Sequence, residues 1–261
     1  MTSSLAGLAV VVTRPARQAA RFMQMLRDRG AATVAFPVLE IEPVRLDVAA
    51  RTSLAPDEYD WVVYTSANAV ERSLPQLGRP MKVRVAAIGR ATSRALAAAG
   101  VDVHAVPGSG ANSEGLLARP EFAEPRGQRI LIVKGVGGRD ALRAGLVSRG
   151  AVVSEAEVYR RVRPAPSAEA LGELDRARES GTVVASVTSV NVLDSLLALA
   201  PEARYPWLRD APLLVPGERV AAEARRREWR GPLVVARSAE DEAMLEALEL
   251  RSSDAGRTTP A

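Results

Sequence analysis

The sequence has no cysteine and a single histidine, His104, and these two absences exclude several kinds of chemistry. Without thiols the chain forms no disulfides, zinc–thiolate sites or iron–sulfur clusters, and it has no cysteine nucleophile. A lone imidazole also excludes a two-histidine metal site. His104 alternates within a predicted strand and has no neighbouring metal ligands, so we interpret it as a structural residue.

Long apolar runs are missing as well. No segment approaches the roughly 18–20 apolar residues of a membrane span. The N-terminus lacks the basic region that precedes the apolar part of a secretory signal. We therefore expect a cytoplasmic protein without membrane contact. The net charge of +4 over 261 residues does not by itself indicate nucleic-acid binding.

Lysine is scarce, since only Lys82 and Lys134 accompany the many arginines. This is typical of codon bias in an arginine-rich proteome, but guanidinium forks also suit carboxylate and phosphate ligands. The remaining composition, 47% hydrophobic and 25% charged, is typical of a soluble globular protein with one large domain or two ordinary ones. The polar last ten residues, 252–261, predict a disordered tail.

Short apolar runs alternate with helical patterns along the whole chain. The expected strands cover 8–12, 32–37, 61–65, 83–88, 101–106, 129–133, 151–159, 183–188, 212–216 and 232–236. The expected helices include 15–30, 67–77, 91–100, 113–118 and 139–150. Such alternation with short loops predicts an α/β fold with mainly parallel sheets.

An internal repeat organises this pattern. Residues 7–38 align without gaps over 127–158, matching glycine, leucine and arginine positions. Further on, TSANAV (65–70) matches TSVNVL (188–193), and Gly89 matches Gly217. The offset drifts slowly, as expected if loops differ while elements correspond. The order of these matches indicates a duplication.

Two charged segments bounded by proline interrupt the α/β alternation at equivalent places in the two halves. We predict linker strands at 37–43 and 158–166, which would form a hinge if they lie side by side. The pair Glu40 and Glu42 in the first segment is more typical of a solvated strand than of a catalytic pair.

Hydroxyl residues stand where predicted strands give way to helices. Thr65-Ser66-Ala67-Asn68 recurs as Thr188-Ser189-Val190-Asn191. One such segment is most simply a helix N-cap, but hydroxyls and amides at a helix N-terminus also bind anions. Because the segment occurs once in each half, we expect a ligand held between two lobes.

Other strand ends carry further candidates. Thr13-Arg14-Pro15 follows the first strand, at the edge where open α/β sheets bind ligands, so Arg14 is either a surface arginine or a carboxylate clamp. The glycine-rich KGVGGRD (134–140) fits neither nucleotide-binding spacing and favours a flexible loop, and GSGANSEG (108–115) also lacks the dinucleotide-binding spacing. Ser113 is expected to cap a helix or contact a ligand. Gly89 and Thr92 form another strand-end pair.

Tyr159 ends a strand, enters the second linker and precedes Arg160-Arg161. It is either an aromatic residue that packs between lobes or a phenol that donates a proton or hydrogen bond to a ligand. An unperturbed phenol has a pKa of about 10, so it would act as an acid at neutral pH.

Taken in order, these segments resemble the uroporphyrinogen-III synthase family. The resemblance covers roughly residues 7–250. It rests on the following stretches: Thr13-Arg14-Pro15, FPVLEIEP (36–43), DWVVYTSANAV (60–70), AIGRATSRAL (87–96), NSEGLL (112–117), VYRR (158–161), VTSVNV (187–192) and VPGERVAAEA (215–224).

The resemblance implies two doubly wound, flavodoxin-like parallel-sheet lobes joined by a two-stranded linker. Lobe 1 would combine residues 1–36 and 167–251, and lobe 2 would cover 44–157. The implied reaction is cyclisation of hydroxymethylbilane to uroporphyrinogen III with loss of water and inversion of ring D. It needs no cofactor or metal. The implied protein is a monomer that receives substrate from hydroxymethylbilane synthase.

The resemblance also assigns site residues. Tyr159 would donate a proton to the leaving hydroxyl. Its substrate-binding positions would be Thr13, Arg14, Thr65, Ser66, Asn68, Gly89, Thr92, Ser113, Thr188, Ser189 and Gly217. Two departures weaken expected carboxylate contacts: Glu218-Arg219-Val220 replaces the hydroxyls common after the last glycine, and Lys134 replaces an arginine.

Two other functions compete with the synthase. The altered segment 218–220 leaves room for a non-catalytic, two-lobed tetrapyrrole-binding regulator on the same scaffold. A nucleotide-using transferase with two α/β lobes is a further alternative, but the sequence lacks phosphate-loop motifs.

Overall fold

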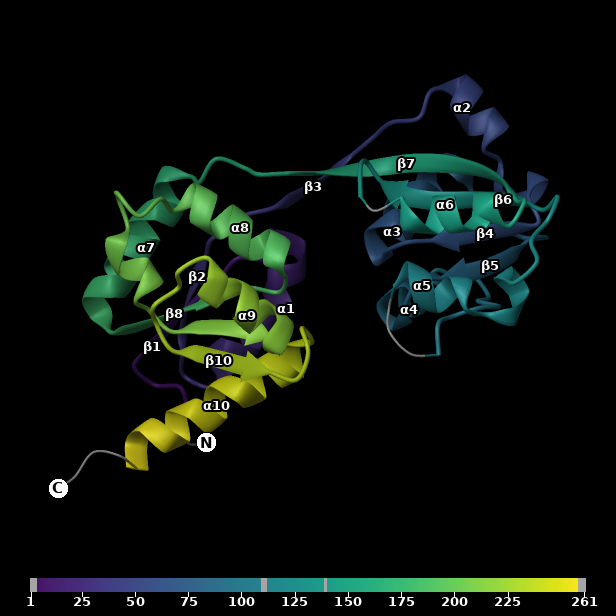
Figure 1. Ribbon diagram of the computed structural model, residues 1–261. Helices are drawn as coiled ribbons and strands as arrows, with labels where there is room; N and C mark the ends of the chain where they lie inside the picture. Colours follow the sequence, from purple (N-terminus) through teal and green to yellow (C-terminus); the bar gives the residue numbers. More distant parts are fainter. Residues whose placement is uncertain (1–3, 109–111, 139, 258–261) are drawn as a thin grey trace. The chain divides into compact units, whose positions relative to one another are not determined.

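Strands rich in β-branched residues form the centre of each sheet. In β1 (Leu8–Val12) and β6 (Arg129–Gly135), nearly every central side chain is buried. Such continuous apolar runs fit strands of parallel sheets that are covered by helices on both faces. The predicted α/β class is therefore confirmed, with two five-stranded sheets (Figure 1).

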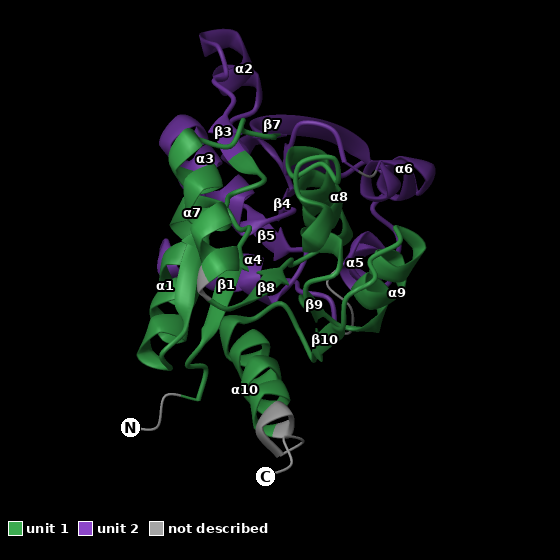
Figure 2. Ribbon diagram, turned by 90° about the vertical axis from the view of Figure 1, so that its left-hand side faces the viewer, with its two compact units in different colours: residues 1–40, 162–261 green, residues 41–161 purple. Residues whose placement is uncertain are grey.

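The computed structural model describes residues 4–108, 112–138 and 140–257. The chain divides into two compact units, coloured separately in Figure 2. Unit 1 comprises residues 1–40 and 162–261, and unit 2 comprises residues 41–161.

Unit 1 contains a sheet in the order β10-β9-β8-β1-β2, in which all neighbouring strands are parallel. This is the flavodoxin-like order. Its elements are β1, α1 (Ala16–Asp28), β2 (Ala32–Ala35), α7 (Ala168–Ser180), β8 (Thr182–Ser186), α8 (Val190–Leu199), η3 (Pro206–Arg209), β9 (Leu213–Pro216), α9 (Glu218–Arg226), β10 (Leu233–Ala236) and α10 (Asp241–Arg257).

Helices cover both faces of this sheet. On one face, α7, α8 and α9 pack over Val11, Ala185 and Val215. On the other, α1 and α10 pack over Val10 and Val184 through Phe22 and other apolar residues. Alternate side chains of one strand therefore enter different cores, as the two-residue period of a strand requires.

Unit 2 contains the sheet β3-β7-β6-β4-β5. The last four strands follow the flavodoxin-like order, while the fifth position is taken by β3, which precedes the others in the chain. Its elements are β3 (Glu40–Pro43), α2 (Val48–Ser53), η1 (Pro56–Glu58), β4 (Trp61–Tyr64), α3 (Ala67–Leu77), β5 (Arg84–Ala87), α4 (Arg90–Ala98), α5 (Ser113–Leu117), η2 (Pro120–Phe122), β6, α6 (Ala141–Ser148) and β7 (Val152–Val162).

Helices also cover both faces of this sheet. Helices α3 and α4 pack on the face that carries Val62 and Leu131, and α5, η2 and α6 pack on the face that carries Val63 and Ile132. Strands β4, β5, β6 and β7 are mutually parallel, so their carboxyl ends lie at one edge. Thr65, Ser66 and Gly89 follow strands at that edge.

The predicted strand at 101–106 is wrong, because only Ala105 forms an isolated bridge, to Ala86. The reason lies in His104, which is structural as expected. The backbone N–H of Val85 donates to the imidazole Nδ1 of His104, 3.1 Å away, while the N–H of His104 donates to the Val85 carbonyl. A side chain thus takes the place that a backbone carbonyl would hold in a continuous ladder.

Two other boundaries differ from expectation. Residues 37–39 do not belong to a linker strand, since Val38 and Leu39 are buried in the core of unit 1 and β3 begins at Glu40. Helix α10 extends through Arg257, so the tail expected from residue 252 is helical over 252–257. Its remaining part, 258–261, lies outside the described residues. Across the described ranges, no helix combines the length and apolar character needed to cross a membrane.

Candidate functional site

Parallel strands bring the predicted site residues of each unit to one sheet edge. In unit 2, Thr65 and Ser66 follow β4, and Gly89 follows β5. In unit 1, Arg14 follows β1 closely, and Ser189 follows β8. Ligands of open α/β sheets bind at this carboxyl edge, where the strand order reverses. The reversal falls between β1 and β8 in unit 1 and between β4 and β6 in unit 2.

Ser66 and Ser189 cap equivalent helices with nearly identical geometry. Ser66 has φ −166° and ψ 162°, and Ser189 has φ −166° and ψ 167°. Each side-chain oxygen accepts a hydrogen bond from the N–H three residues on, Ala69 at 3.1 Å and Val192 at 3.3 Å. The expected capping is therefore present in both halves. Each helix still presents the positive end of its dipole to the edge.

Thr13 and Thr65 hold neighbouring strands together at the two reversal points. Thr13 Oγ1 donates to the Ser186 carbonyl at 2.6 Å, and Thr65 Oγ1 lies 3.1 Å from the carbonyl of Val133. Thr13 is fully buried, whereas Thr65 is half-buried. Both hydroxyls are thus engaged by the protein itself, and the Thr13 hydroxyl is out of reach of a ligand in this structure.

Arg14 is similarly engaged. Its guanidinium pairs with Asp241 at the start of α10, donates to the Ala239 carbonyl at 3.0 Å, and lies over the Phe22 ring. Only 11% of each side chain of the Arg14–Asp241 pair is exposed. The carboxylate bound by Arg14 in this structure is therefore the protein's own.

The other predicted binding residues differ in their accessibility. Half-buried positions are Asn68, Ser113, Thr188 and Gly217. Gly89 begins α4 and is buried, and Thr92 is only 3% exposed. Gly217 has φ +98°, a left-handed conformation that favours glycine. Ser113 does not cap α5, because Asn112 accepts from the Gly115 N–H instead.

Tyr159 is nearly buried, with 2% of its surface exposed. Its hydroxyl lies 3.1 Å from Ser66 Oγ, and Arg161 Nη2 donates to the same hydroxyl at 3.1 Å. The Arg161 guanidinium also lies over the tyrosine ring. The phenol therefore reaches the carboxyl edge of unit 2 through Ser66.

A bulge in the β6–β7 ladder gives Tyr159 this orientation. Lys134 pairs with Glu157, but Gly135 pairs with Tyr159, so Val158 is the extra residue. Strict alternation would place consecutive residues on opposite faces, yet Val158 and Tyr159 both pack in the same core. A Cβ at Gly135 would lie 2.6 Å from Tyr159 Cζ, so the ring needs a glycine there.

Sequence reasoning missed Gly135 and gave Arg161 no role. Long-range contacts such as the bulge leave no pattern in a single sequence, although the spacing Tyr159–Arg161 was visible. Two exposed arginines at helix starts were likewise given no binding role: Arg90 is the first residue of α4, and Arg219 is the second residue of α9. Neither guanidinium forms an ion pair or hydrogen bond with another residue in the described part of the chain.

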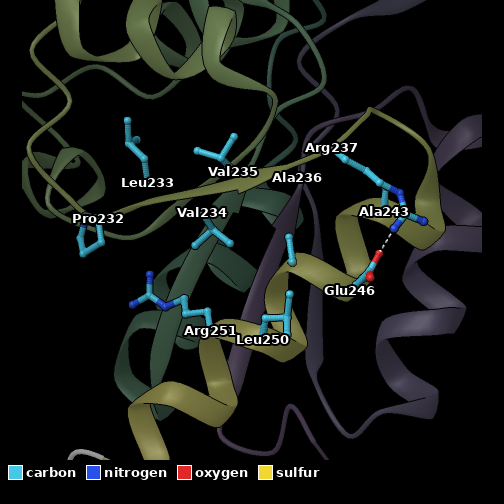
Figure 3. A pocket seen from close by; sticks show the side chains of 11 residues that line it. Pro232, Leu233, Val234, Val235, Ala236, Arg237, Ala243, Glu246, Leu250 and Arg251 are labelled. Carbon is cyan, nitrogen blue, oxygen red and sulfur yellow. Dashed lines mark hydrogen bonds and ion pairs between the residues drawn. The ribbon is translucent and has the colours of Figure 1, made fainter.

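A cavity of about 680 Å³ lies elsewhere, against the edge strand β10 and α10 (Figure 3). Val234, Leu250 and Arg251 contribute to its lining, and Arg237 pairs with Glu246 beside it. Burial lowers the pKa of Arg251. The predicted site residues do not line this cavity, so it is separate from the edges described above.

Comparison with known proteins gives a consistent result. A family profile described as uroporphyrinogen-III synthase HemD matches residues 20–246. The chain is 35% identical over 250 residues to uroporphyrinogen-III synthase of Salmonella typhimurium, covering 93% of this chain and 100% of that protein. It is 33% identical over 249 residues to the Escherichia coli K12 enzyme, with the same coverage.

The fold has solved counterparts. A mutant uroporphyrinogen III synthase from the extremely thermophilic bacterium Thermus thermophilus matches with a TM-score of 0.62 at 22% identity, covering 96% of this chain and 100% of that one. The synthetase from Helicobacter pylori 26695 matches with a TM-score of 0.62 at 16% identity, covering 95% of this chain and 100% of that one.

Proposed function

We propose, since the chain belongs to the uroporphyrinogen-III synthase HemD family, that it cyclises hydroxymethylbilane to uroporphyrinogen III with inversion of ring D and loss of water. It is an enzyme of tetrapyrrole biosynthesis, a hydro-lyase. The observation that carries the mechanism is the chain of contacts Arg161–Tyr159–Ser66 at the carboxyl edge of unit 2.

The substrate is a linear tetrapyrrole with eight carboxylates, and the carboxyl edge of each unit offers groups that bind anions. The N-termini of α3 and α8 provide N–H groups and a positive dipole end. Arg90 and Arg219 add cations that have no other ion pair among the described residues, whereas Arg14 is bound to Asp241. We therefore assign the carboxylate contacts to these helix starts and to Arg90 and Arg219.

The enzyme has two tasks in this reaction. It helps the hydroxyl leave from the hydroxymethyl carbon, and it restricts how ring D attacks the resulting azafulvene. The electron-rich pyrrole supplies the electrons that expel the oxygen, so a positioned acid is sufficient. Tyr159 is the proton source in this proposal, because its hydroxyl reaches the carboxyl edge through Ser66 and a phenol can act as a general acid. The leaving oxygen takes the tyrosine proton and departs as water, and the hydrogen that the closing ring carbon loses replaces that proton, so the net change is the loss of one water.

An isomer-resolved assay tests the function. Hydroxymethylbilane generated freshly by its synthase is supplied to the purified protein, and the uroporphyrinogen isomers are separated after quenching. We expect isomer III, whereas the substrate alone closes to isomer I without inversion. Isomer I as the only product would overturn the enzymatic function and leave the tetrapyrrole-binding regulator as the better description.

We also propose that the protein acts as a monomer in the cytoplasm and receives its substrate from hydroxymethylbilane synthase. The helices of each unit cover both faces of its own sheet. The predicted site residues at the carboxyl edges therefore need no second copy of the chain. Sedimentation at micromolar concentration should give a species of 27.7 kDa. A dimer that persists on dilution would contradict this part of the proposal.

A further inference from the structure

Within the proposed reaction, we infer that Ser66 delivers the proton to the departing hydroxyl and that Tyr159 supplies this proton to Ser66. Arg161 is a positioning residue that sets the direction of proton transfer from Tyr159 to Ser66. The inference rests on the proposed function. Its basis is the set of donors and acceptors around two hydroxyl groups, both in unit 2.

The direction of the Tyr159–Ser66 hydrogen bond follows from the other contacts of each oxygen. Arg161 Nη2 has only protons to offer, so the Tyr159 oxygen accepts from it. The Ala69 N–H likewise donates to Ser66 Oγ. If Ser66 also donated to Tyr159, the phenol proton would be left in a nearly buried environment without another acceptor among the described residues.

The phenol therefore donates to Ser66, which already accepts from Ala69. With both acceptor positions of Ser66 Oγ filled, its own proton points away from Tyr159 and Ala69. Ser66 is half-buried, whereas Tyr159 is 2% exposed. The hydroxyl that meets a ligand at this edge is consequently that of the serine.

The C–O bond of the hydroxymethyl group breaks as its oxygen takes the Ser66 proton and leaves as water. The Tyr159 proton moves to Ser66 Oγ at the same time. Electrons from the pyrrole nitrogen form the new double bond to the former hydroxymethyl carbon as the C–O bond electrons leave with the oxygen. The phenolate that remains lies beside the Arg161 guanidinium. It regains a proton when the ring carbon that closes the macrocycle loses its hydrogen.

Unit 1 contains a natural contrast. Ser189 caps α8 with the same type of hydrogen bond and nearly the same dihedral angles, but no tyrosine hydroxyl donates to it among the described residues. The capping role alone therefore does not require the Tyr159 contact. Ser66 and Ser189 share one cap geometry, but within the described ranges only Ser66 contacts a phenol. Comparing the two serines therefore separates helix capping from proton delivery.

The test is a double-mutant cycle in the isomer-resolved assay. Ser66→Ala and Tyr159→Phe should each lower kcat by at least about 10-fold. The double variant should be no slower than the slower single variant, because both substitutions break one relay. Losses that multiply would overturn the relay and leave two independent roles. Isomer I alone from the wild type would instead overturn the proposed function, before any variant is compared.

Further variants separate the relay from stability. Ser66→Asn keeps an N-cap but has no hydroxyl, so Tm should stay within a few degrees of wild type while kcat falls as in Ser66→Ala. Ser66→Thr should restore most of kcat. Full kcat in a folded Ser66→Asn variant would overturn the inference. Ser189→Ala should lower Tm about as much as Ser66→Ala, because each serine caps a helix with the same type of hydrogen bond.

Arg161 is tested by its effect on kcat rather than KM. Arg161→Gln should lower kcat several-fold with KM within twofold of wild type, and Arg161→Lys should recover part of the loss, since a cation remains. Arg160→Gln is the matched control, because Arg160 is exposed and, among the described residues, the hydrogen bond and cation–π contact of an arginine with Tyr159 come from Arg161. Equal losses in the Arg160 and Arg161 variants would contradict a positioning role.

Discussion

The ring of Tyr159 occupies the space that a side chain at Gly135 would need. A Cβ on Gly135 would come within 2.6 Å of Tyr159 Cζ and 2.7 Å of Cε2. The two residues are paired across the bulge of β6 and β7, so the ring could make room for a side chain only if one of these hydrogen-bonded strands moved. Gly135 therefore fixes where the phenol hydroxyl lies.

Gly135→Ala should displace that ring. We expect kcat in the isomer-resolved assay to fall by at least about 10-fold, with a loss of roughly 1–3 kcal/mol in the free energy of unfolding from the forced shift. Gly172→Ala in α7 is the control, since its nearest neighbour would be 3.4 Å away. That change should stabilise the protein by about 0.4–1 kcal/mol. Unchanged kcat in Gly135→Ala would mean that the ring position does not matter.

Arg14 is expected to act in folding rather than in substrate binding. Arg14→Met and Asp241→Asn should each destabilise the protein, and their double-mutant cycle should show a coupling of about 0.5–3 kcal/mol in urea unfolding. Arg21, which also lies 3.2 Å from Asp241, will retain part of the interaction in Arg14→Met. A large rise in KM with unchanged stability would show instead that Arg14 binds substrate carboxylates.

Arg90 and Arg219 should bind substrate. Arg90→Gln and Arg219→Gln are each expected to raise KM about 2- to 10-fold, because an exposed charge pair contributes only modestly, and to leave Tm within a few degrees of wild type. Arg225→Gln is the matched control, since Arg225 lies in the last turn of α9, at the far end from Arg219. If Arg225→Gln changed KM as much as Arg219→Gln, the effect would come from the overall charge of the protein and not from a substrate contact of Arg219.

Stability should fall steeply above pH 10. Burial raises the pKa of Tyr64 to about 12, although a hydrogen bond with Ser73 acts in the opposite direction. The unfolded phenol titrates near 10, so the unfolded state loses its proton first and is favoured as the pH rises from 10 to 12. The raised pKa of Tyr64 contributes about 2–3 kcal/mol to the free energy of unfolding. This contribution is fully present below pH 10 and is lost as the pH rises through 12.

Urea unfolding at pH 8 and pH 11 measures this effect. Tyr64→Phe removes the titrating group, so the variant should lose less stability over the same interval than wild type. Tyr205, whose pKa is also raised by burial, remains in both proteins and cancels in the comparison. An equal loss in both proteins would contradict the assignment to Tyr64.

Local patterns predicted much of the fold and part of the candidate site. The apolar run at 8–12 and the helix at 67–77 match β1 and α3 in their bounds. The repeated hydroxyl segments indicated two helix starts, and Ser66 and Ser189 cap them. These features depend on residues within one or two turns of each other, which a single sequence displays.

Features that depend on distant residues could not be predicted. The orientation of Tyr159 requires the bulge opposite Gly135, and the engagement of Arg14 requires Asp241, 227 positions away. The strand expected at 101–106 fails because the His104 ring, rather than a backbone carbonyl, accepts from Val85. In each case a side chain takes a partner that local periodicity does not reveal.

A hydrogen-exchange footprint tests most directly where the substrate binds. With uroporphyrinogen III added under anaerobic conditions, we predict slower exchange at the helix starts 66–70, 90–93, 189–193 and 218–221. Protection confined to 232–237 and 243–251, which flank the cavity beside β10, would contradict the assignment of the carboxyl edges as the binding site.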